Sequence, residues 1–189
     1  MMNDKTRKSI TAWIGFLLIT LSGILLHFAF EASGGHTLVG AFTPVNESVW
    51  EHLKLLLYPT ILYAIVEYFC HGQFAPSFFA GKIYSLFLGM LLIVGGYYTY
   101  TGILGQRYTV IDIGLFIAAS ALTVYLSNYV LGESNTLAGD TQSIIALLLL
   151  TVTILFFIYF TFHPPMLELF RDPITEDFGI KPSISLFNT

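Results

Sequence analysis

The segment IIALLLLTVTILFFIYFTF, residues 144–162, contains no charged side chain. Its length approaches the roughly 20 apolar residues that a helix needs to cross about 30 Å of hydrocarbon. The whole chain of 189 residues is 55% hydrophobic and 11% charged, whereas about a quarter of the residues in an ordinary soluble domain are charged. The segment and the composition together predict an integral membrane protein.

Four more apolar segments precede this one, at residues 10–30, 49–69, 79–99 and 110–131. With it, they predict an all-α fold, an integral membrane bundle of about five transmembrane helices. The length favours a single membrane domain over residues 1–189, in which the proline-rich tail 163–189 is irregular. We expect a multi-pass protein of the cell membrane, with the lipid bilayer as its partner.

Lysine and arginine near the span ends favour a cytoplasmic N-terminus. Lys5, Arg7 and Lys8 precede the first span, and Lys82 falls on the same side. Arg107 belongs to the other face, which the charge bias makes the outer one. With five spans, the C-terminal tail is then expected outside.

The composition excludes several kinds of site. The net charge of −4, with only 8 Lys and Arg residues, gives no basic face for nucleic acid. The single cysteine, Cys70, excludes an intramolecular disulfide and a cysteine-based zinc site. Any metal site therefore has to use histidine and carboxylate ligands. The sequence indicates no oligomeric state.

Most polar side chains of the predicted spans fall at the ends that share the outer face. His27 and Glu31 close the first span, Asp112 opens the fourth, and His163 follows the fifth. Ionisable groups at membrane depth cost about 2.5 to 3.5 kcal/mol each on insertion scales and usually face a cavity or one another. Span ends are also where polar residues cost least, but the gathering favours a polar pocket near this face.

The stretch TPVNESVWEHLKLLLYP, residues 43–59, brings several of these polar side chains to the start of the second span. Pro44 suits a first helical turn, and Ser48 followed by Glu51 matches a capping box. The i, i+4, i+7 spacing of Glu47, Glu51 and Lys54 predicts one helical stripe, on which Lys54 pairs with a carboxylate. Capping does not account for His52 or Lys54, so both point toward the predicted pocket.

Proline and glycine in the spans predict two features of the backbone. Pro59 cannot donate a hydrogen bond to the carbonyl of Leu55, which predicts a kink near residues 55–59. Gly95 and Gly96 in the third span, like Gly89 before them, are expected to allow neighbouring helices to approach closely.

Histidine and carboxylate side chains near the outer face suit zinc or a related divalent metal ion. His27 and Glu31 are four residues apart, so a helix brings them to one side. The candidate metal ligands are His27, Glu31, His52 and His163. No contiguous motif such as H-E-x-x-H is present, and a lone histidine in a membrane helix is more often a hydrogen-bonded packing residue.

Five motifs extend over most of the chain: LLHFAFEASG (25–34), PVNESVWEHLKL (44–55), YYTYTGILG (97–105), IDIGLF (111–116) and FTFHPPMLELFRDP (160–173). In these motifs the sequence resembles a family of small multi-pass bacterial membrane proteins, domain of unknown function 6512. The resemblance implies about five spanning helices and a bacterial origin, and it supplies no reaction. The tail reads RDPITEDFGI where the family leads us to expect a Gly-x-Tyr-Gly ending.

Three functions remain open at this point. In a metal-dependent membrane hydrolase, the candidate catalytic residues are Glu47, Glu51, Lys54 and Asp112, with Glu47 or Asp112 as the general base. In a small-solute or ion-coupled transporter, the same carboxylates and Lys54 bind the solute or a proton. In a non-catalytic assembly protein, the polar cluster is a buried network that fixes the helix register.

Overall fold

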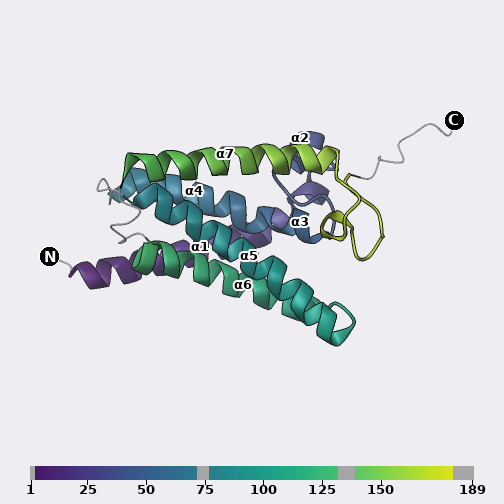
Figure 1. The fold of residues 1–189 in the computed structure, drawn as a ribbon, viewed down its shortest axis with the longest axis horizontal. Coiled ribbons are helices and arrows are strands. Elements are labelled where there is room, and N and C mark those ends of the chain that lie inside the picture. Colours follow the sequence, from purple (N-terminus) through teal and green to yellow (C-terminus); the bar gives the residue numbers. More distant parts are fainter. Residues whose placement is uncertain (1–2, 72–76, 132–138, 181–189) are drawn as a thin grey trace.

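Five long helices form the molecule in a computed structural model that describes residues 3–71, 77–131 and 139–180 (Figure 1). They are α1 (Asp4–Ala32), α4 (Lys54–His71), α5 (Phe78–Leu104), α6 (Thr109–Tyr125) and α7 (Asp140–Phe162). Each forms most of a helical segment that is long and apolar enough to cross a membrane. No strand occurs in the described ranges, so the predicted all-α bundle is confirmed.

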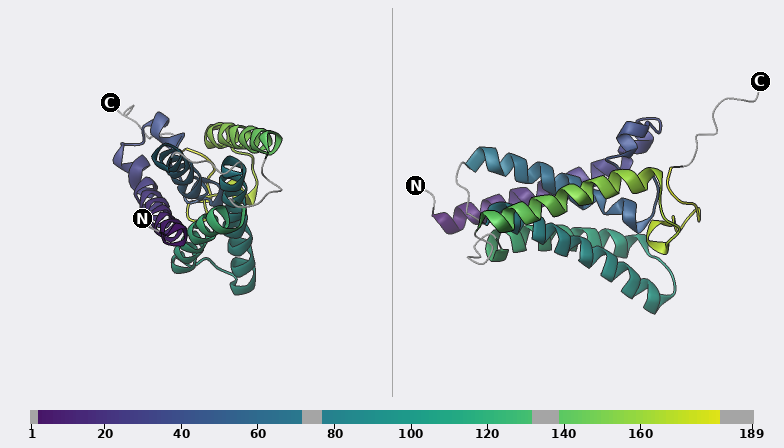
Figure 2. Two further views of the ribbon diagram at one scale, coloured as in Figure 1. Left: turned by 90° about the vertical axis from the view of Figure 1, so that its left-hand side faces the viewer. Right: turned by 45° about the horizontal axis from the view of Figure 1, so that its top comes forward.

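The helices pack as a bundle around α4 and α5. Helix α1 runs along α4, α6 runs along α5, and α7 packs on the other side of α5 (Figure 2). In the most apolar 18 residues of each segment, 56% are buried in the segment that contains α4, and 17% are buried in α7. The buried core therefore centres on α4 and α5, with side chains such as Leu56, Leu86 and Phe157. Large apolar side chains on the outward faces are exposed, as a lipid-facing surface requires.

Short elements gather at one end of the bundle, opposite the start of α1 (Figure 1). They are α2 (Thr37–Gly40), α3 (Val49–His52) and the 3-10 helix η3 (Glu168–Phe170). A π-helix, η1 (Leu126–Leu131), extends α6 at the other end. The end with α3 is where the predicted polar side chains lie.

The second predicted span is interrupted at Leu53, between α3 and α4, and α4 passes through Pro59 without a break. The kink expected near residues 55–59 stays a prediction. The Leu55 carbonyl, to which Pro59 cannot donate, faces α1 at Gly23, where an added β-carbon would lie 2.7 Å from the oxygen. Gly89 likewise lies against α6 and α4, but a β-carbon on Gly95 would meet nothing within 4 Å. The close approach expected at Gly95 is therefore wrong, whereas Gly96 lies against Leu115 of α6 as expected.

A buried ion pair lies near the opposite end of the bundle. Lys82 Nζ is 2.6 Å from the Glu67 carboxylate and donates to Asn128 Oδ1 at 2.9 Å and to Ser127 Oγ at 3.2 Å. The ammonium also lies 5.1 Å from the centre of the Tyr63 ring. Lys82 thus lies on the side predicted for it, and its contacts connect α4, α5 and η1.

Candidate functional site

The loop before α3 is fixed by the C-terminal tail. Asn46 donates a side-chain hydrogen bond to the Gly179 carbonyl at 3.1 Å, and the Glu47 N–H donates to Asp172 Oδ2 at 3.3 Å. Trp50 stacks on Phe157 of α7, with ring centres 4.2 Å apart, and lies 4.7 Å from the ring of buried Phe170. Residues 163–180 of the tail pack on the bundle and position the residues around Glu47.

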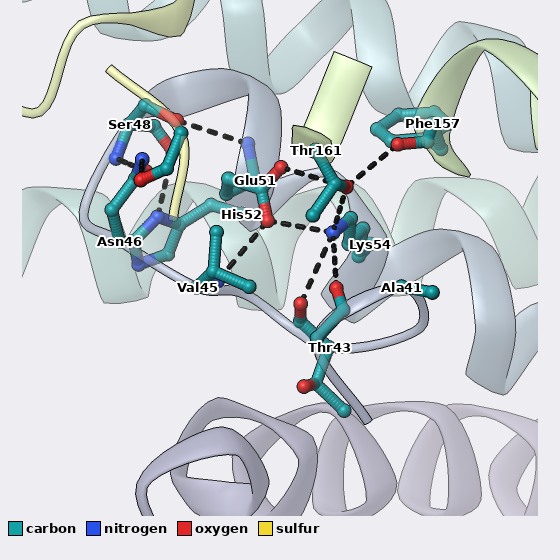
Figure 3. Close-up of polar contacts among 12 residues, drawn as sticks. Ala41, Thr43, Val45, Asn46, Ser48, Glu51, His52, Lys54, Phe157 and Thr161 are labelled. Carbon is teal, nitrogen blue, oxygen red and sulfur yellow. Dashed lines mark hydrogen bonds and ion pairs between the residues drawn. The ribbon is translucent and has the colours of Figure 1, made fainter. Parts of the chain in front are cut away.

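Lys54 is the centre of a buried polar network beneath this loop (Figure 3). Its ammonium nitrogen is 2.6 Å from Glu51 Oε2 and 2.6 Å from Thr161 Oγ1. It also donates to the carbonyl oxygens of Gly40 at 2.9 Å and Thr43 at 3.1 Å. Four oxygens therefore surround three N–H donors, and the network joins α2, the loop, α3 and α7. The predicted pairing of Lys54 with a carboxylate is present, with Glu51.

The helix start agrees with the predicted Ser48 cap, and it leaves Glu47 outside the predicted stripe. Helix α3 begins at Val49, with Ser48 as its N-cap, and the Ser48 hydroxyl accepts from the Glu51 N–H at 3.3 Å. Pro44 lies in the preceding loop, so its expected place in the first helical turn is wrong. Glu47 precedes the helix as well, and it does not share a stripe with Glu51 and Lys54. It is therefore free to turn toward α1.

His27, Glu47 and His52 converge at this end of the bundle. His27 Nε2 lies 3.7 Å from Glu47 Oε1, and His52 Nε2 lies 3.7 Å from Glu47 Oε2. The three potential ligand atoms all lie within 4.8 Å of one another. Within residues 3–71, 77–131 and 139–180, this is the one group of three or more such side chains close enough to hold a metal ion. We refer to these three residues as the triad.

The hydrogen bond at the back of His52 determines how its ring faces Glu47. His52 Nδ1 is 2.9 Å from the Ser48 carbonyl oxygen, and a carbonyl can only accept, so Nδ1 carries the hydrogen. In the neutral imidazole, Nε2 then presents a lone pair toward the Glu47 carboxylate. Two acceptors that face each other repel unless a positive charge, a metal ion or a proton, lies between them.

A small cavity of about 60 Å³ lies beside the triad and is large enough for several water molecules. Its polar lining consists of Glu47, His52, Tyr97, Arg107 and Asp112, and its apolar lining includes Leu115 and Phe116. Glu47 also lines a second, outer cavity of about 510 Å³, together with His27, Glu31 and Asp172. The triad therefore lies where two cavities meet.

Arg107 and Asp112 form the far side of the smaller cavity, on and next to the short connection between α5 and α6. Arg107 Nη2 lies 3.3 Å from Glu47 Oε2, and its Nε lies 3.4 Å from Asp112 Oδ2. Tyr100 donates a short hydrogen bond to Asp112 and accepts one from the Tyr108 N–H at 3.2 Å. Gly105 closes α5 with a φ of 74°, a left-handed conformation that suits glycine.

Asp172 lies outside the five spans and acts on Glu47 from the tail. Burial alone would raise the pKa of the Asp172 carboxyl, but hydrogen bonds from the N–H groups of Ile174, Glu47 and Thr175 outweigh burial and lower it below the usual value. Because the carboxylate form accepts all three bonds, ionised Asp172 holds the backbone of Glu47 in place.

The remaining predicted site residues lie apart from the triad. Glu31 is exposed on the wall of the outer cavity, and His163 caps the end of α7, where its ring stacks on Tyr159 at 5.0 Å. Glu51 belongs to the Lys54 network. The metal-ligand roles of Glu31 and His163, and the catalytic roles of Glu51 and Lys54, stay predictions.

Sequence reasoning did not assign Arg107 or Asp172 to the site. The sequence places Arg107 with Asp112 at the polar end of the bundle but gives it no role there, and it places Asp172 only in the tail. A signal for Arg107 was present, because it lies five residues before Asp112 in a connection too short to separate the two widely.

The family of the chain follows from its sequence. A model described as a family of unknown function (DUF6512) matches residues 2–180. The chain belongs to this family. The triad, Arg107, Asp112 and Asp172 all lie within the matched range. No curated protein and no solved structure matches the chain, so its function has to be argued from the geometry of the site.

Proposed function

We propose that this chain is a membrane-embedded, metal-dependent hydrolase in which His27, Glu47 and His52 hold a divalent ion of the zinc class. The observation that carries the proposal is the pair of 3.7 Å separations between Glu47 and the two imidazoles. They are too long for hydrogen bonds. Ligands that bind zinc at about 2.0 to 2.2 Å with tetrahedral geometry are roughly 3.3 to 3.6 Å apart, which is close to the separations here.

The ligand set and the cavity together favour catalysis over a purely structural ion. Two histidines and one glutamate leave a fourth coordination position, as in catalytic zinc sites, whereas structural sites use four protein ligands. The cavity of about 60 Å³ adjoins two of the three ligands, Glu47 and His52, and offers space on that side. An ion of this class, when bound, supplies an activated water near neutral pH.

The remaining residues of the cavity have distinct roles in this proposal. Asp112, oriented by Tyr100 and paired with Arg107, is the general base that accepts a proton from the attacking water. Arg107 stabilises negative charge that develops on the substrate. Glu51 and Lys54 are assigned to the network that holds the loop and α3 in position, because the ammonium of Lys54 is surrounded by protein oxygens.

The substrate class follows from where the site lies. The five helices are long and apolar enough to cross a membrane, and the triad is at one end of the bundle. We therefore propose a lipid or another membrane-adjacent substrate, in the cell membrane, with the triad near the outer face.

The metal is tested first, on full-length protein purified in detergent without added metal or chelator. Elemental analysis should find about one zinc-class ion per chain, and chelation should lower the unfolding temperature, because a ligand that binds only the folded state stabilises it. His52→Ala should lose the ion. His163→Ala, a histidine outside the triad, should keep it.

Wild-type protein that holds no metal, and whose unfolding temperature does not respond to added zinc, would overturn the proposal. That result would leave Arg107 as the cation that faces Glu47. Hydrolysis is tested separately with fluorogenic ester, amide and phosphodiester lipids. Asp112→Asn should retain the ion and lose turnover by about 100-fold or more.

A further inference from the structure

Arg107 lines the cavity and has a side-chain donor that no group in the described part of the chain accepts. Its Nη1 is buried and makes no hydrogen bond to any residue in the described ranges. Its other groups face carboxylates, with Nη2 3.3 Å from Glu47 and Nε 3.4 Å from Asp112. A buried guanidinium donor without an acceptor is costly, and an acceptor from outside the protein would relieve that cost.

The formal charges around the cavity show which kind of ligand suits the site when the triad holds a divalent metal ion. Glu47 and Asp112 contribute two negative charges and Arg107 contributes one positive charge, which leaves one negative charge when both histidines are neutral. A divalent ion on the triad changes this total to one positive charge. The loaded site is therefore complementary to an anion, and the metal-free site is not.

We propose that the metal-loaded site binds an oxyanion, such as a phosphate group, between the ion and Arg107. One oxygen of the anion takes the open coordination position, and another accepts from Arg107 Nη1 in a charge-assisted hydrogen bond. This inference rests on the proposed function and narrows it: the substrate carries an anionic phosphate-like group next to the bond that is cleaved. The apolar wall formed by Leu55, Ile93 and Phe116 adjoins the lipid part of such a substrate.

The test measures binding of inorganic phosphate to full-length protein in a non-ionic detergent, before and after loading with zinc. Phosphate should bind saturably to zinc-loaded wild type and raise its unfolding temperature, and it should bind the metal-free protein much more weakly. Arg107→Gln should keep its zinc and bind phosphate about 10- to 100-fold more weakly, the usual effect of a charge-assisted hydrogen bond. Arg107→Lys should restore part of the affinity.

Arg171→Gln is the matched control, because Arg171 pairs with Glu168 and Glu176 on the tail and does not line this cavity. It should bind phosphate like the wild type. The source of the oxyanion is tested with phosphatidic acid in mixed micelles. Competition between this lipid and phosphate supports a lipid headgroup, and phosphate binding that the lipid leaves unchanged supports a free, water-soluble oxyanion.

The outcomes separate this inference from the proposed function. Wild-type protein that binds no zinc overturns both. Protein that binds one zinc per chain but binds no phosphate, or binds it equally well in Arg107→Gln, overturns the oxyanion site alone. If Arg107→Gln also loses zinc, the comparison passes to Arg107→Lys, which keeps the charge next to Glu47 and must still bind phosphate less tightly than wild type.

Discussion

Replacing Lys54 with methionine should strongly destabilise the folded protein, because it leaves the Glu51 carboxylate buried without its cation. Lys54 is fully buried and its ammonium is 2.6 Å from the Glu51 carboxylate. Lys54→Met leaves that carboxylate buried with only the Val45 N–H and the Thr161 hydroxyl as donors. Removing one partner of a buried ion pair costs about 3 to 5 kcal/mol of unfolding free energy.

The double variant Lys54→Met with Glu51→Gln removes both charges. It should be more stable than the sum of the two single changes indicates, by about 1 to 3 kcal/mol. The assay is reversible unfolding in mixed detergent micelles, followed by tryptophan fluorescence. Lys5→Met is the control, because Lys5 is exposed near the start of α1 and its loss should change stability by less than about 0.5 kcal/mol.

Additive effects in this cycle, or a Lys54→Met variant within about 0.5 kcal/mol of the wild type, would refute the reasoning. Either result would mean that the carboxylate reaches water or another donor when the ammonium is absent. Lys54 would then not be the centre of the network.

Three more perturbations test other parts of the fold. Gly23→Ala should cost about 1 to 3 kcal/mol by overpacking α1 against Leu55 and Phe116; Gly95→Ala, with nothing within 4 Å, should cost nothing measurable in the same unfolding assay. Asp172 has a lowered folded pKa, so its stabilising effect is full above the ordinary carboxyl value of 3.8 and is lost as the pH falls through the lower folded value. The difference in unfolding temperature between wild type and Asp172→Asn should therefore shrink at the acid end of a pH series, and a difference that is constant with pH would contradict this account. Trp50→Ala should release the tail from Phe157 and Phe170 and speed trypsin cleavage after Arg171, whereas Trp13→Ala, an exposed tryptophan on α1, should not.

The number and type of the helices could be predicted because they depend on runs of apolar residues along the chain. Each spanning segment needs about 20 consecutive apolar residues, whatever its neighbours are. The break at Leu53 could not be predicted in the same way. It accompanies the Lys54 network, in which Lys54 reaches back to carbonyl groups of the preceding loop, and that contact exists only in the folded bundle.

The sequence predicts that polar side chains gather at one end of the bundle. It does not predict which of them form the triad. His27 was singled out because it closes the first span four residues before Glu31, and His52 because capping does not account for it. Their meeting with Glu47 depends on where α3 begins. Ser48 with Glu51 three residues later already indicated a start after Ser48, which leaves Glu47 outside the helix. The stripe of Glu47, Glu51 and Lys54 was wrong because it extended the helix back past this start.

The two clusters at this end of the molecule are mechanically connected, and this affects how variants should be interpreted. Lys54 holds the Thr43 carbonyl and Asp172 holds the Glu47 N–H, so the loop that carries Glu47 is fixed on both sides. A change at Lys54 or Asp172 should therefore weaken zinc binding by loosening Glu47, while saturating zinc still loads one ion per chain. His52→Ala removes a ligand, so added zinc should not restore full loading at the same concentration. If a Lys54 variant binds zinc more weakly but still binds one ion per chain, Lys54 is a positioning residue. A variant that no longer binds one ion per chain has lost a ligand.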